Sequence, residues 1–390
     1  MSGSDAMGVE LAEQPGVWAR LWSRRAELAR VLDELTDGQP PERVVFAGCG
    51  DCHCAAEFAE WWIELRTAVP ARGFEAMEFS RQRAAWGRAG DLVVGLSVSG
   101  RTPRTVEALR VARAGGARTL ALTDDPNAPL AREADGVFVL GTAPPEALAR
   151  TDYRDPEAAR YTGYHRAVGQ TKTYGALQMA LAVLGLWLEG RRPSGRGNPR
   201  SAVEEALGRL PERSEEAART ARRAAERVLE SSRPGVRVAF CGSGPNRSTA
   251  RFAAYKVMEL ARPAAHAEIE EFCHTVYLVT RPGDIAVFFA HDRATAERAG
   301  EIAPVVSEVV GGRVQVLATV PAEPAVRFPG VPAEVSPLLM AFAAAHWVRR
   351  LAQGWGVNTD RFRAGEDEER YVRGSQRMIR ESAVWNRRGN

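Results

Sequence analysis

An apolar strand followed by a glycine turn and a helix occurs twice in this chain. Val44–Gly50 reads VVFAGCG, and Val238–Gly244 reads VAFCGSG about 190 residues later. After each copy, further short apolar runs alternate with helical patterns; we expect Phe74–Phe79 and Leu92–Leu96 to be strands of the first set. Such alternation predicts parallel sheets covered by helices. The long separation of the copies indicates a duplicated domain rather than a solenoid repeat.

The expected fold class is α/β, with two doubly wound parallel sheets in flavodoxin-like strand order. In such sheets ligands bind beyond the carboxyl ends of the strands. A stretch rich in Pro, Gly, Ser and Arg (191–200) is the best candidate for a linker. The predicted organisation is a helical lead-in at 1–42, a first domain at 43–190, a linker and connecting helix at 191–232, a second domain at 233–355 and a charged tail at 356–390.

Charge and composition exclude several classes of protein. A net charge of +3 over 390 residues does not favour nucleic acid or an anionic membrane as partner. The apolar stretches are too short or too interrupted to span a membrane, and the chain does not open with a secretory signal. Five cysteines, an odd number, do not suggest a disulfide framework. We therefore expect a cytoplasmic protein with neither nucleic-acid nor membrane partners.

The loop after Leu92–Leu96 has the composition of a phosphate site. Ser97, Ser99, Gly100 and Thr102 lie just before a helical pattern, so hydroxyls and backbone N–H groups meet the positive end of a helix. The loop lacks the Gly-Lys-Ser/Thr of a P-loop and the three spaced glycines of a dinucleotide site. This favours a phosphomonoester such as a sugar phosphate. The alternative interpretation is a helix cap that binds nothing.

Together, the two strand–turn–helix units and this single loop resemble the sugar isomerase (SIS) family over roughly residues 40–355. The resemblance is to its tandem members, namely the isomerase half of glutamine–fructose-6-phosphate aminotransferases and related sugar-phosphate isomerases, deaminases and deglycases. It implies that the sequence S-x-S-G-x-T binds phosphate through Ser97, Val98, Ser99, Gly100 and Thr102. It also implies a contribution from the first turn, through Gly50 and Cys52, where Cys52 replaces the usual serine.

Three further motifs carry the resemblance. The family's S-T-K corresponds to Gln170-Thr171-Lys172, its K-x-x-E to Lys256–Glu259, and its E-[FL]-x-H to Glu271–His274. The resemblance implies that Glu259 transfers a proton between sugar carbons C1 and C2 and that His274 opens the sugar ring. It implies that Gln170, Lys172 and Lys256 line the sugar pocket. It also implies a homodimer with shared active sites; we expect neither metal nor cofactor.

The residue types suit these roles independently of the resemblance. Glu259 ends an apolar helical pattern, where burial would raise its pKa toward that of a useful base. His274 has the ordinary pKa of a proton shuttle. The chain has only two lysines, Lys172 and Lys256, and both fall in these motifs. The alternative for Glu259 is a surface carboxylate that pairs with Lys256 at i,i+3. The alternative for His274 is an ordinary loop histidine with no role in catalysis.

Departures from the family pattern narrow the predicted function. Gln170 replaces a serine that contacts sugar, which suggests an altered substrate, and Thr275-Val276 replace the usual Gly-Pro after the histidine. The aminotransferase's C-terminal lysine has no counterpart, and we expect no glutaminase activity. A zinc site in the cysteine-rich turn 49–54 is disfavoured because its ligands crowd one turn. The predicted function is sugar-phosphate isomerisation, or deamination or deglycation of an amino-sugar phosphate; the alternative is a non-catalytic sugar-phosphate sensor.

Overall fold

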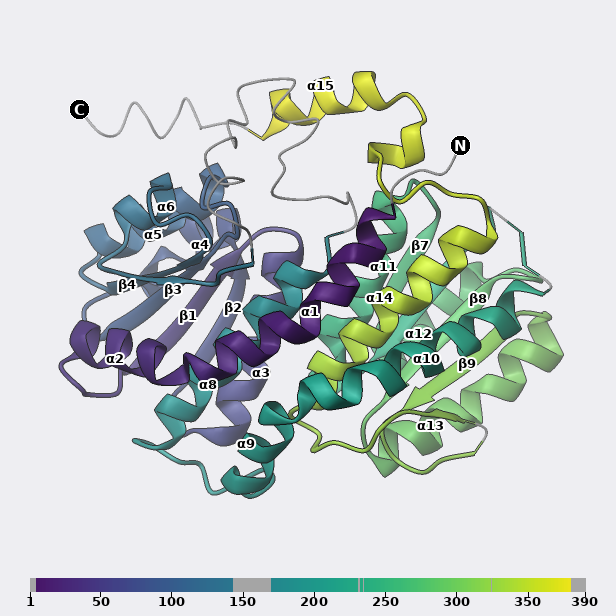
Figure 1. Ribbon diagram of the computed structural model, residues 1–390, viewed down its shortest axis with the longest axis horizontal. Helices are drawn as coiled ribbons and strands as arrows, with labels where there is room; N and C mark the ends of the chain where they lie inside the picture. The colour runs from purple at the N-terminus through teal and green to yellow at the C-terminus, as the bar shows by residue number, and fades with distance from the viewer. Residues whose placement is uncertain (1–4, 143–169, 231, 234, 324, 380–390) are drawn as a thin grey trace. The chain divides into compact units, whose positions relative to one another are not determined.

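The computed structural model describes residues 5–379 except 143–169, 231, 234 and 324 (Figure 1). The chain divides into two compact units, each built on one five-stranded parallel sheet. The first-sheet unit comprises Leu21–Arg166, Ala176–Arg196 and Asp367–Asn390, and the second-sheet unit comprises Met1–Arg20, Ala167–Gly175 and Gly197–Glu366. These units do not follow the linear boundaries expected from the sequence. The start of the lead-in and the connecting helices group with the second sheet.

The first sheet has the order β2-β1-β3-β4-β5. This is the flavodoxin-like order, so the predicted fold class is confirmed for this unit. The central strands β1 and β3 are buried almost throughout, as parallel strands covered on both faces must be. The strands are β1 (Arg43–Gly48), β2 (Ala71–Glu75), β3 (Asp91–Leu96), β4 (Arg118–Thr123) and β5 (Gly136–Val139).

Two groups of helices cover the first sheet (Figure 1). One face carries α4 (Ala76–Gln82), α5 (Pro103–Ala114) and α6 (Pro129–Glu133), with the short η1 (Ala84–Trp86) nearby; the other carries α2 (Arg25–Thr36), α3 (Asp51–Arg66) and α8 (Lys172–Glu189). On this second face, the Trp187 indole donates to Asp33 at 3.0 Å and joins α8 to α2. Gly185 lets the Trp62 ring of α3 approach α8, because a Cβ there would lie 2.2 Å from that ring.

The second sheet repeats the first. Its order, β10-β9-β8-β6-β7, is the same sequence of strands read from the opposite edge, so the predicted duplication of the fold is confirmed. Its strands are β6 (Val238–Gly242), β7 (Ala264–Ala267), β8 (Ile285–Ala290), β9 (Arg313–Ala318) and β10 (Ala325–Arg327).

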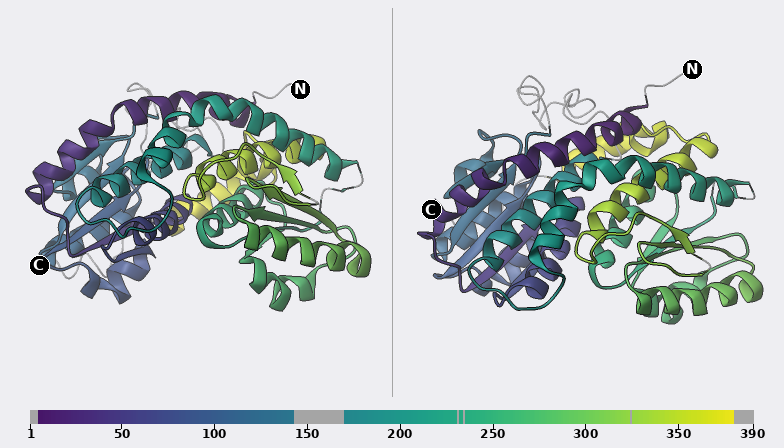
Figure 2. Two further views of the ribbon diagram at one scale, coloured as in Figure 1. Left: turned by 90° about the horizontal axis from the view of Figure 1, so that it is seen from below. Right: turned by 60° about the horizontal axis from the view of Figure 1, so that its bottom comes forward.

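Helices α10 (Leu210–Leu229), α11 (Arg247–Glu259) and α14 (Ser336–Gly354) cover one face of the second sheet, and α10 and α14 lie side by side in all views (Figures 1 and 2). The other face carries α12 (Ile269–His274), α13 (Arg293–Pro304) and η4 (Val305–Val310). Helix α1 (Ala6–Ser23) joins this unit through Trp18, whose ring lies 5.3 Å from that of Phe342 on α14. The remaining elements are α9 (Arg200–Gly208), η2 (Gly244–Asn246), η3 (Val276–Val279), η5 (Phe362–Gly365) and α15 (Glu368–Met378).

A turn of sequence Arg-x-Gly-Asp precedes the third strand in both units, at 88–91 and at 281–284. In each turn the aspartate accepts the N–H of the arginine three residues earlier, at 3.1 Å for Asp91 and 3.0 Å for Asp284. Each aspartate also holds the beginning of the first strand: Asp91 binds the Arg43 guanidinium and Asp284 accepts the Arg237 N–H. The duplication therefore includes the hydrogen bonds of this turn as well as the strand–turn–helix unit.

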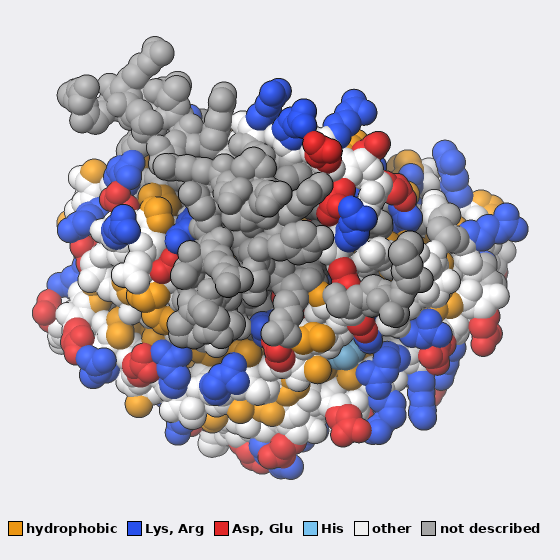
Figure 3. All heavy atoms as spheres, turned by 45° about the horizontal axis from the view of Figure 1, so that its top comes forward, with side chains coloured by type: hydrophobic (Ala, Val, Ile, Leu, Met, Phe, Trp, Pro, Cys, Tyr) orange, Lys and Arg blue, Asp and Glu red, His pale blue; other side chains and the backbone are white. Residues whose placement is uncertain are grey.

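Basic and acidic side chains are interspersed on the face shown in Figure 3. This distribution agrees with the small net charge of +3. Among the described residues, none of the helices has the length and apolar character needed to cross a membrane.

Candidate functional site

The loop between β3 and α5 forms a compact hydroxyl-lined turn. The Ser97 and Thr102 hydroxyl oxygens lie 3.0 Å apart, and the Arg101 N–H donates to the Ser99 hydroxyl at 3.3 Å. Ser97 and Ser99 are buried, and Thr102 directly precedes Pro103, the first residue of α5. Polar side chains are thus concentrated at the positive end of a helix, an arrangement that suits an anion with several acceptor oxygens.

Gly100 fixes the shape of this loop. Its φ of +65° is one that side-chain-bearing residues rarely adopt, and an added Cβ would lie 2.4 Å from Ala128 Cβ and 2.8 Å from the Thr123 hydroxyl. The Gly100 carbonyl accepts the Leu130 N–H at 3.0 Å, and the Val98 carbonyl accepts the Asp124 N–H at 2.8 Å. The segment after β4 therefore supports the loop from behind.

The turn after β1 emerges beside this loop, because Gly48 of β1 and Leu96 of β3 are register partners. Gly50 (φ +58°) precedes α3, and the Cys52 N–H donates to the Cys49 carbonyl at 3.1 Å. Cys49 donates to Glu75 at 3.3 Å, and burial raises the pKa of its thiol to about 12. Among the described residues, no three His, Cys, Asp or Glu side chains are grouped so that they could hold a metal ion.

The second-sheet unit lacks such a loop at the equivalent position. After β8, its third strand, Asp292 accepts the Thr295 N–H at 2.8 Å and caps α13 with its own carboxylate. A fixed carboxylate at a helix N-terminus occupies the place, and carries the charge, that an anionic ligand would otherwise have. The duplicated folds thus differ at the one loop that the sequence singled out.

Lys256 is the centre of a second polar cluster, in the second-sheet unit. Its side chain is 1% exposed, and its ammonium donates to Glu259 at 2.8 and 2.9 Å and to the Gln170 carbonyl at 3.1 Å. The Glu259 side chain is 32% exposed, less buried than the sequence predicted. Glu259 and Lys256 therefore form the i,i+3 pair that the sequence offered as the alternative, but the lysine of this pair is buried.

Lys172 and two glutamates of α1 extend this cluster. The Lys172 ammonium donates to Glu13 at 2.6 Å, and the Thr171 N–H donates to Glu10 at 3.0 Å. Glu10 is 1% exposed; burial raises the pKa of its carboxyl, opposed by the N–H bonds and by both lysines. The sequence reasoning missed both glutamates, which lie about 160 positions from their partners.

His274 is placed differently. It ends α12 with its side chain 67% exposed, and its Nε2 atom lies 3.5 Å from the Glu270 carboxylate. Helix α11 runs between β6 and β7, so Glu259 lies toward the start of β7, whereas α12 follows the end of that strand. Within the second-sheet unit the chain path therefore separates the two predicted catalytic residues by the length of β7.

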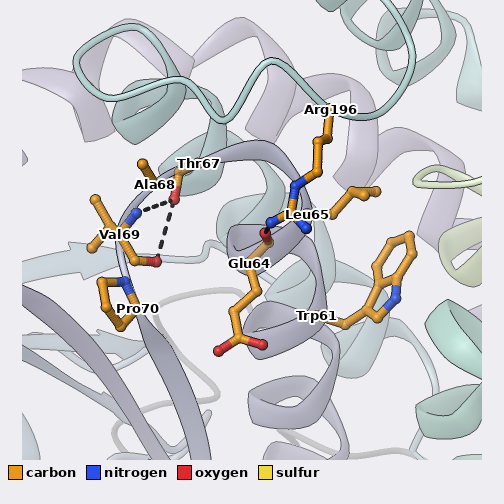
Figure 4. Close-up of a pocket in the computed structure, with 8 residues that line it drawn as sticks. All are labelled: Trp61, Glu64, Leu65, Thr67, Ala68, Val69, Pro70 and Arg196. Atoms are coloured by element: carbon orange, nitrogen blue, oxygen red, sulfur yellow. Dashed lines mark hydrogen bonds between the residues drawn. The ribbon is translucent and has the colours of Figure 1, made fainter.

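A hollow of about 490 Å³ lies in the first-sheet unit, beside the beginning of strand β2 (Figure 4). It is formed where α3 ends and β2 begins, by residues that include Trp61, Val69 and Pro70, and Arg196 closes one side by donating to the Glu64 carbonyl at 2.5 Å. The β3–α5 loop follows the carboxyl end of its strand, so this hollow does not coincide with it.

The fold is that of the open parallel α/β proteins, in which ligands bind beyond the carboxyl ends of the strands, where the β3–α5 loop lies. Residues 39–154 match the family model for the SIS domain. This part of the chain is therefore a SIS domain, and the resemblance to the SIS family is confirmed there.

Relatives of known sequence include glutamine–fructose-6-phosphate aminotransferases. That of Bradyrhizobium diazoefficiens is 33% identical over 150 residues, covering 37% of this chain and 24% of the relative. That of Symbiobacterium thermophilum is 30% identical over 212 residues, covering 52% of this chain and 31% of the relative. The matches thus span about a quarter to a third of those aminotransferases.

Solved structures show the same fold over most of the chain. The C-terminal domain of glucosamine–fructose-6-phosphate aminotransferase from Francisella tularensis superposes with a TM-score of 0.73 at 18% identity, covering 92% of this chain and 99% of the other. The tagatose-6-phosphate ketose/aldose isomerase of Escherichia coli gives 0.71 at 16% identity, covering 92% and 95%. At these identities the likeness concerns the fold.

Proposed function

We propose that this protein acts in the cytoplasm on a phosphorylated sugar or amino sugar, by moving a proton between C1 and C2. The reaction is an aldose–ketose isomerisation, or the deamination or deglycation of an amino-sugar phosphate. The observation that carries the proposal is the hydroxyl-lined loop after β3, within the SIS domain. Names of relatives and structural neighbours include fructose-6-phosphate, tagatose-6-phosphate and glucosamine-6-phosphate as the compounds those proteins act on.

The loop binds the phosphate of the substrate. The hydroxyls of Ser97, Ser99 and Thr102 donate to phosphate oxygens, together with the Val98 and Gly100 region of the backbone and the positive end of α5. Gly50 and Cys52 contribute the neighbouring turn. The absence of a lysine from this loop suits a monoester, which needs fewer charges than a nucleotide triphosphate.

Glu259 transfers the proton. In the aldose-to-ketose direction its carboxylate removes the C2 proton while the C1 carbonyl oxygen gains one, which gives an enediol; the carboxyl then returns a proton to C1 as the C2 hydroxyl loses its own. The Lys256 ammonium donates to both oxygens of the Glu259 carboxylate and so holds the base in place. Gln170 and Lys172 contact the sugar. With an amine on C2, the same transfer gives an imine that water hydrolyses, and ammonia leaves.

His274 opens the sugar ring and shuttles protons between the substrate oxygens. The chain path places it beyond the end of β7, away from Glu259, so we propose that His274 of a second copy serves each site in a homodimer with shared active sites.

One observation favours the alternative function, a sugar-phosphate sensor. Glu259 is already paired with Lys256, as a purely structural carboxylate would be. In a sensor the loop would bind the same ligands, but the protein would not exchange their carbon-bound protons.

Substitution of Glu259 by Gln tests the two functions against each other. We expect the wild-type protein in deuterated water to exchange the C1 or C2 proton of fructose 6-phosphate, tagatose 6-phosphate or glucosamine 6-phosphate, measured by proton NMR. Glu259→Gln should slow the exchange at least about a hundredfold while the probe still binds, because only the base is lost. Ser99→Ala should instead weaken probe binding about tenfold, since a hydroxyl donor to an anion is removed.

Glu297→Gln, in an exposed pair on α13, is the matched control and should behave as wild type. Binding of a probe without exchange in the wild-type protein would favour the sensor. If none of the three probes bound, and Ser99→Ala had no effect on any ligand, the phosphate site itself would be rejected.

A further inference from the structure

We propose that Glu10, on the lead-in helix α1, is a positioning residue for the proposed reaction. It holds the Gln170–Lys172 segment, whose Gln170 carbonyl binds Lys256, and Lys256 in turn binds Glu259. The inference rests on the proposed function, because Glu259 has its role only there. It assigns part of the active-site support to a helix outside the matched SIS domain, residues 39–154.

Glu10 is a carboxylate placed where carboxylates are rare. It is 1% exposed, and one of its oxygens accepts the Thr171 N–H at 3.0 Å. Among the described residues, its other oxygen has no hydrogen-bond partner. Burying such a group costs several kcal/mol unless nearby charges compensate it, so its surroundings should contain positive charge.

That positive charge comes from the only two lysines of the chain. Both Lys172 and Lys256 interact electrostatically with the Glu10 carboxylate. Their ammonium groups are held by other carboxylates, Glu13 and Glu259. Glu10 therefore lies between the two lysines in a series of alternating charges. The series begins at the partly exposed Glu13 and ends at Glu259, the proposed base.

The backbone of one short segment connects these charges. Glu10 holds the Thr171 N–H, and one residue away the Gln170 carbonyl accepts from Lys256 at 3.1 Å. Just inside α8, Tyr174 stacks on Phe252 of α11, with centroids 4.1 Å apart and planes at 13°. The Lys256 ammonium lies 5.2 Å from the Phe252 ring. Helices α1, α8 and α11 are thus joined at the place where Lys256 meets Glu259.

Two consequences follow if Glu10 is neutralised. Lys256 loses one of two opposite charges and pairs more strongly with Glu259, which makes that carboxylate a weaker base. The Gln170–Lys172 segment also loses part of what fixes it, and a small displacement of a catalytic group lowers rate more than affinity. Both effects reduce kcat rather than raise KM.

The test compares Glu10→Gln with Glu13→Gln. Gln at position 10 keeps the volume and an acceptor for the Thr171 N–H but removes the charge. With the probe sugar phosphate that the wild-type protein converts, we expect kcat to fall about tenfold and KM to change less than about threefold. Glu13→Gln removes the partner of Lys172, a proposed sugar contact, so it should raise KM while changing kcat less than about twofold.

A second readout does not require activity. In protein labelled with 13C-lysine, only two lysine side chains give signals, and Lys172→Arg assigns them. Glu10→Gln should move both 13Cε resonances, whereas Glu13→Gln should move that of Lys172 alone. Unchanged kcat and unchanged resonances in a folded Glu10→Gln protein would overturn the inference. If the wild-type protein converts no probe, the proposed function fails, and the resonances still decide whether Glu10 joins the two lysines.

Glu10→Asp completes the test if Glu10→Gln does not fold. Aspartate keeps the charge near both lysines but is one methylene too short to retain the 3.0 Å bond to Thr171. We expect kcat to fall while both lysine resonances stay near those of the wild-type protein. A wild-type kcat in this variant would show that the bond positions nothing.

Discussion

At the scale of single residues, the second-sheet unit carries several titratable groups inside apolar surroundings. Glu10 and Lys256 compensate each other, as described above. His346 on α14 is not compensated: it is 7% exposed, its ring packs against Phe342 at 4.6 Å, and among the described residues neither ring nitrogen has a hydrogen-bond partner. Burial, with Arg222 and Arg349 nearby, lowers the pKa of His346 to about 3.

His346 should make the protein sensitive to acid. The unfolded chain binds a proton at this histidine below about pH 6.5, whereas the folded protein does so only near pH 3, so the free energy of unfolding falls as the pH drops through that range. The full displacement corresponds to at most about 5 kcal/mol. His346→Phe removes this dependence, so its advantage over wild type in urea unfolding should grow as pH falls from 7 to 4. A difference that is the same at every pH would contradict a neutral buried His346.

Sequence reasoning reached some of these residues and not others, for a physical reason. The scarcity of lysine pointed to Lys172 and Lys256, and both are buried, with side chains 9% and 1% exposed. Nothing local to position 10 or 13 distinguishes those glutamates from any on a solvated helix. Their partners lie about 160 positions away, so only the folded chain reveals the contact.

At the scale of elements, boundaries were less predictable than the elements themselves. The strand expected at 74–79 is wrong: β2 is Ala71–Glu75, and helix α4 follows at once. The switch comes from Glu75, whose side chain accepts the Met77 and Glu78 N–H groups and so caps α4. Similarly, the connecting helix expected within 191–232 is two helices that meet at Arg209, because Pro211 lies in the first turn of α10 and favours a new helix start there. The β3–α5 loop, in contrast, spans Ser97–Thr102, the segment that its hydroxyls predicted.

The shape of that loop depends on Gly100, and this can be measured. Gly100→Ala combines a positive φ with a Cβ 2.4 Å from Ala128, so we expect a loss of about 2–4 kcal/mol in the free energy of unfolding, and weaker binding of sugar phosphates. Gly116→Ala is the matched control. Its φ is +85°, but the nearest atom to its Cβ would be 3.6 Å away, so it should lose only about 1 kcal/mol. Equal losses in both variants would mean that the contact behind the loop is unimportant.

At the scale of the whole molecule, the two copies of one fold carry different polar groups. The first-sheet unit has the hydroxyl-lined loop, whereas the second caps α13 with Asp292 at the equivalent turn and carries the Lys256 cluster. Strand order and duplication could be predicted because periodicity and turn residues are local properties of the sequence. The assignment of α1 and α10 to the second-sheet unit could not, because it depends on which helix faces pack together.

The separation of Glu259 and His274 by the length of β7 leads to a test of shared active sites. Glu259→Gln and His274→Asn should each be nearly inactive in the exchange assay with the probe that the wild type converts. If His274 acts on the site of a partner copy, then a mixed dimer has one site with both native residues. Random reassembly makes half of the dimers mixed, each with one of two sites intact, so the mixture should recover about a quarter of wild-type activity. The control for subunit exchange gives the two variants different affinity tags, and recovery of both tags in one dimer shows that mixed dimers form. No recovery, with exchange of subunits demonstrated by that control, would place His274 and Glu259 of the same chain in one site and refute the shared arrangement.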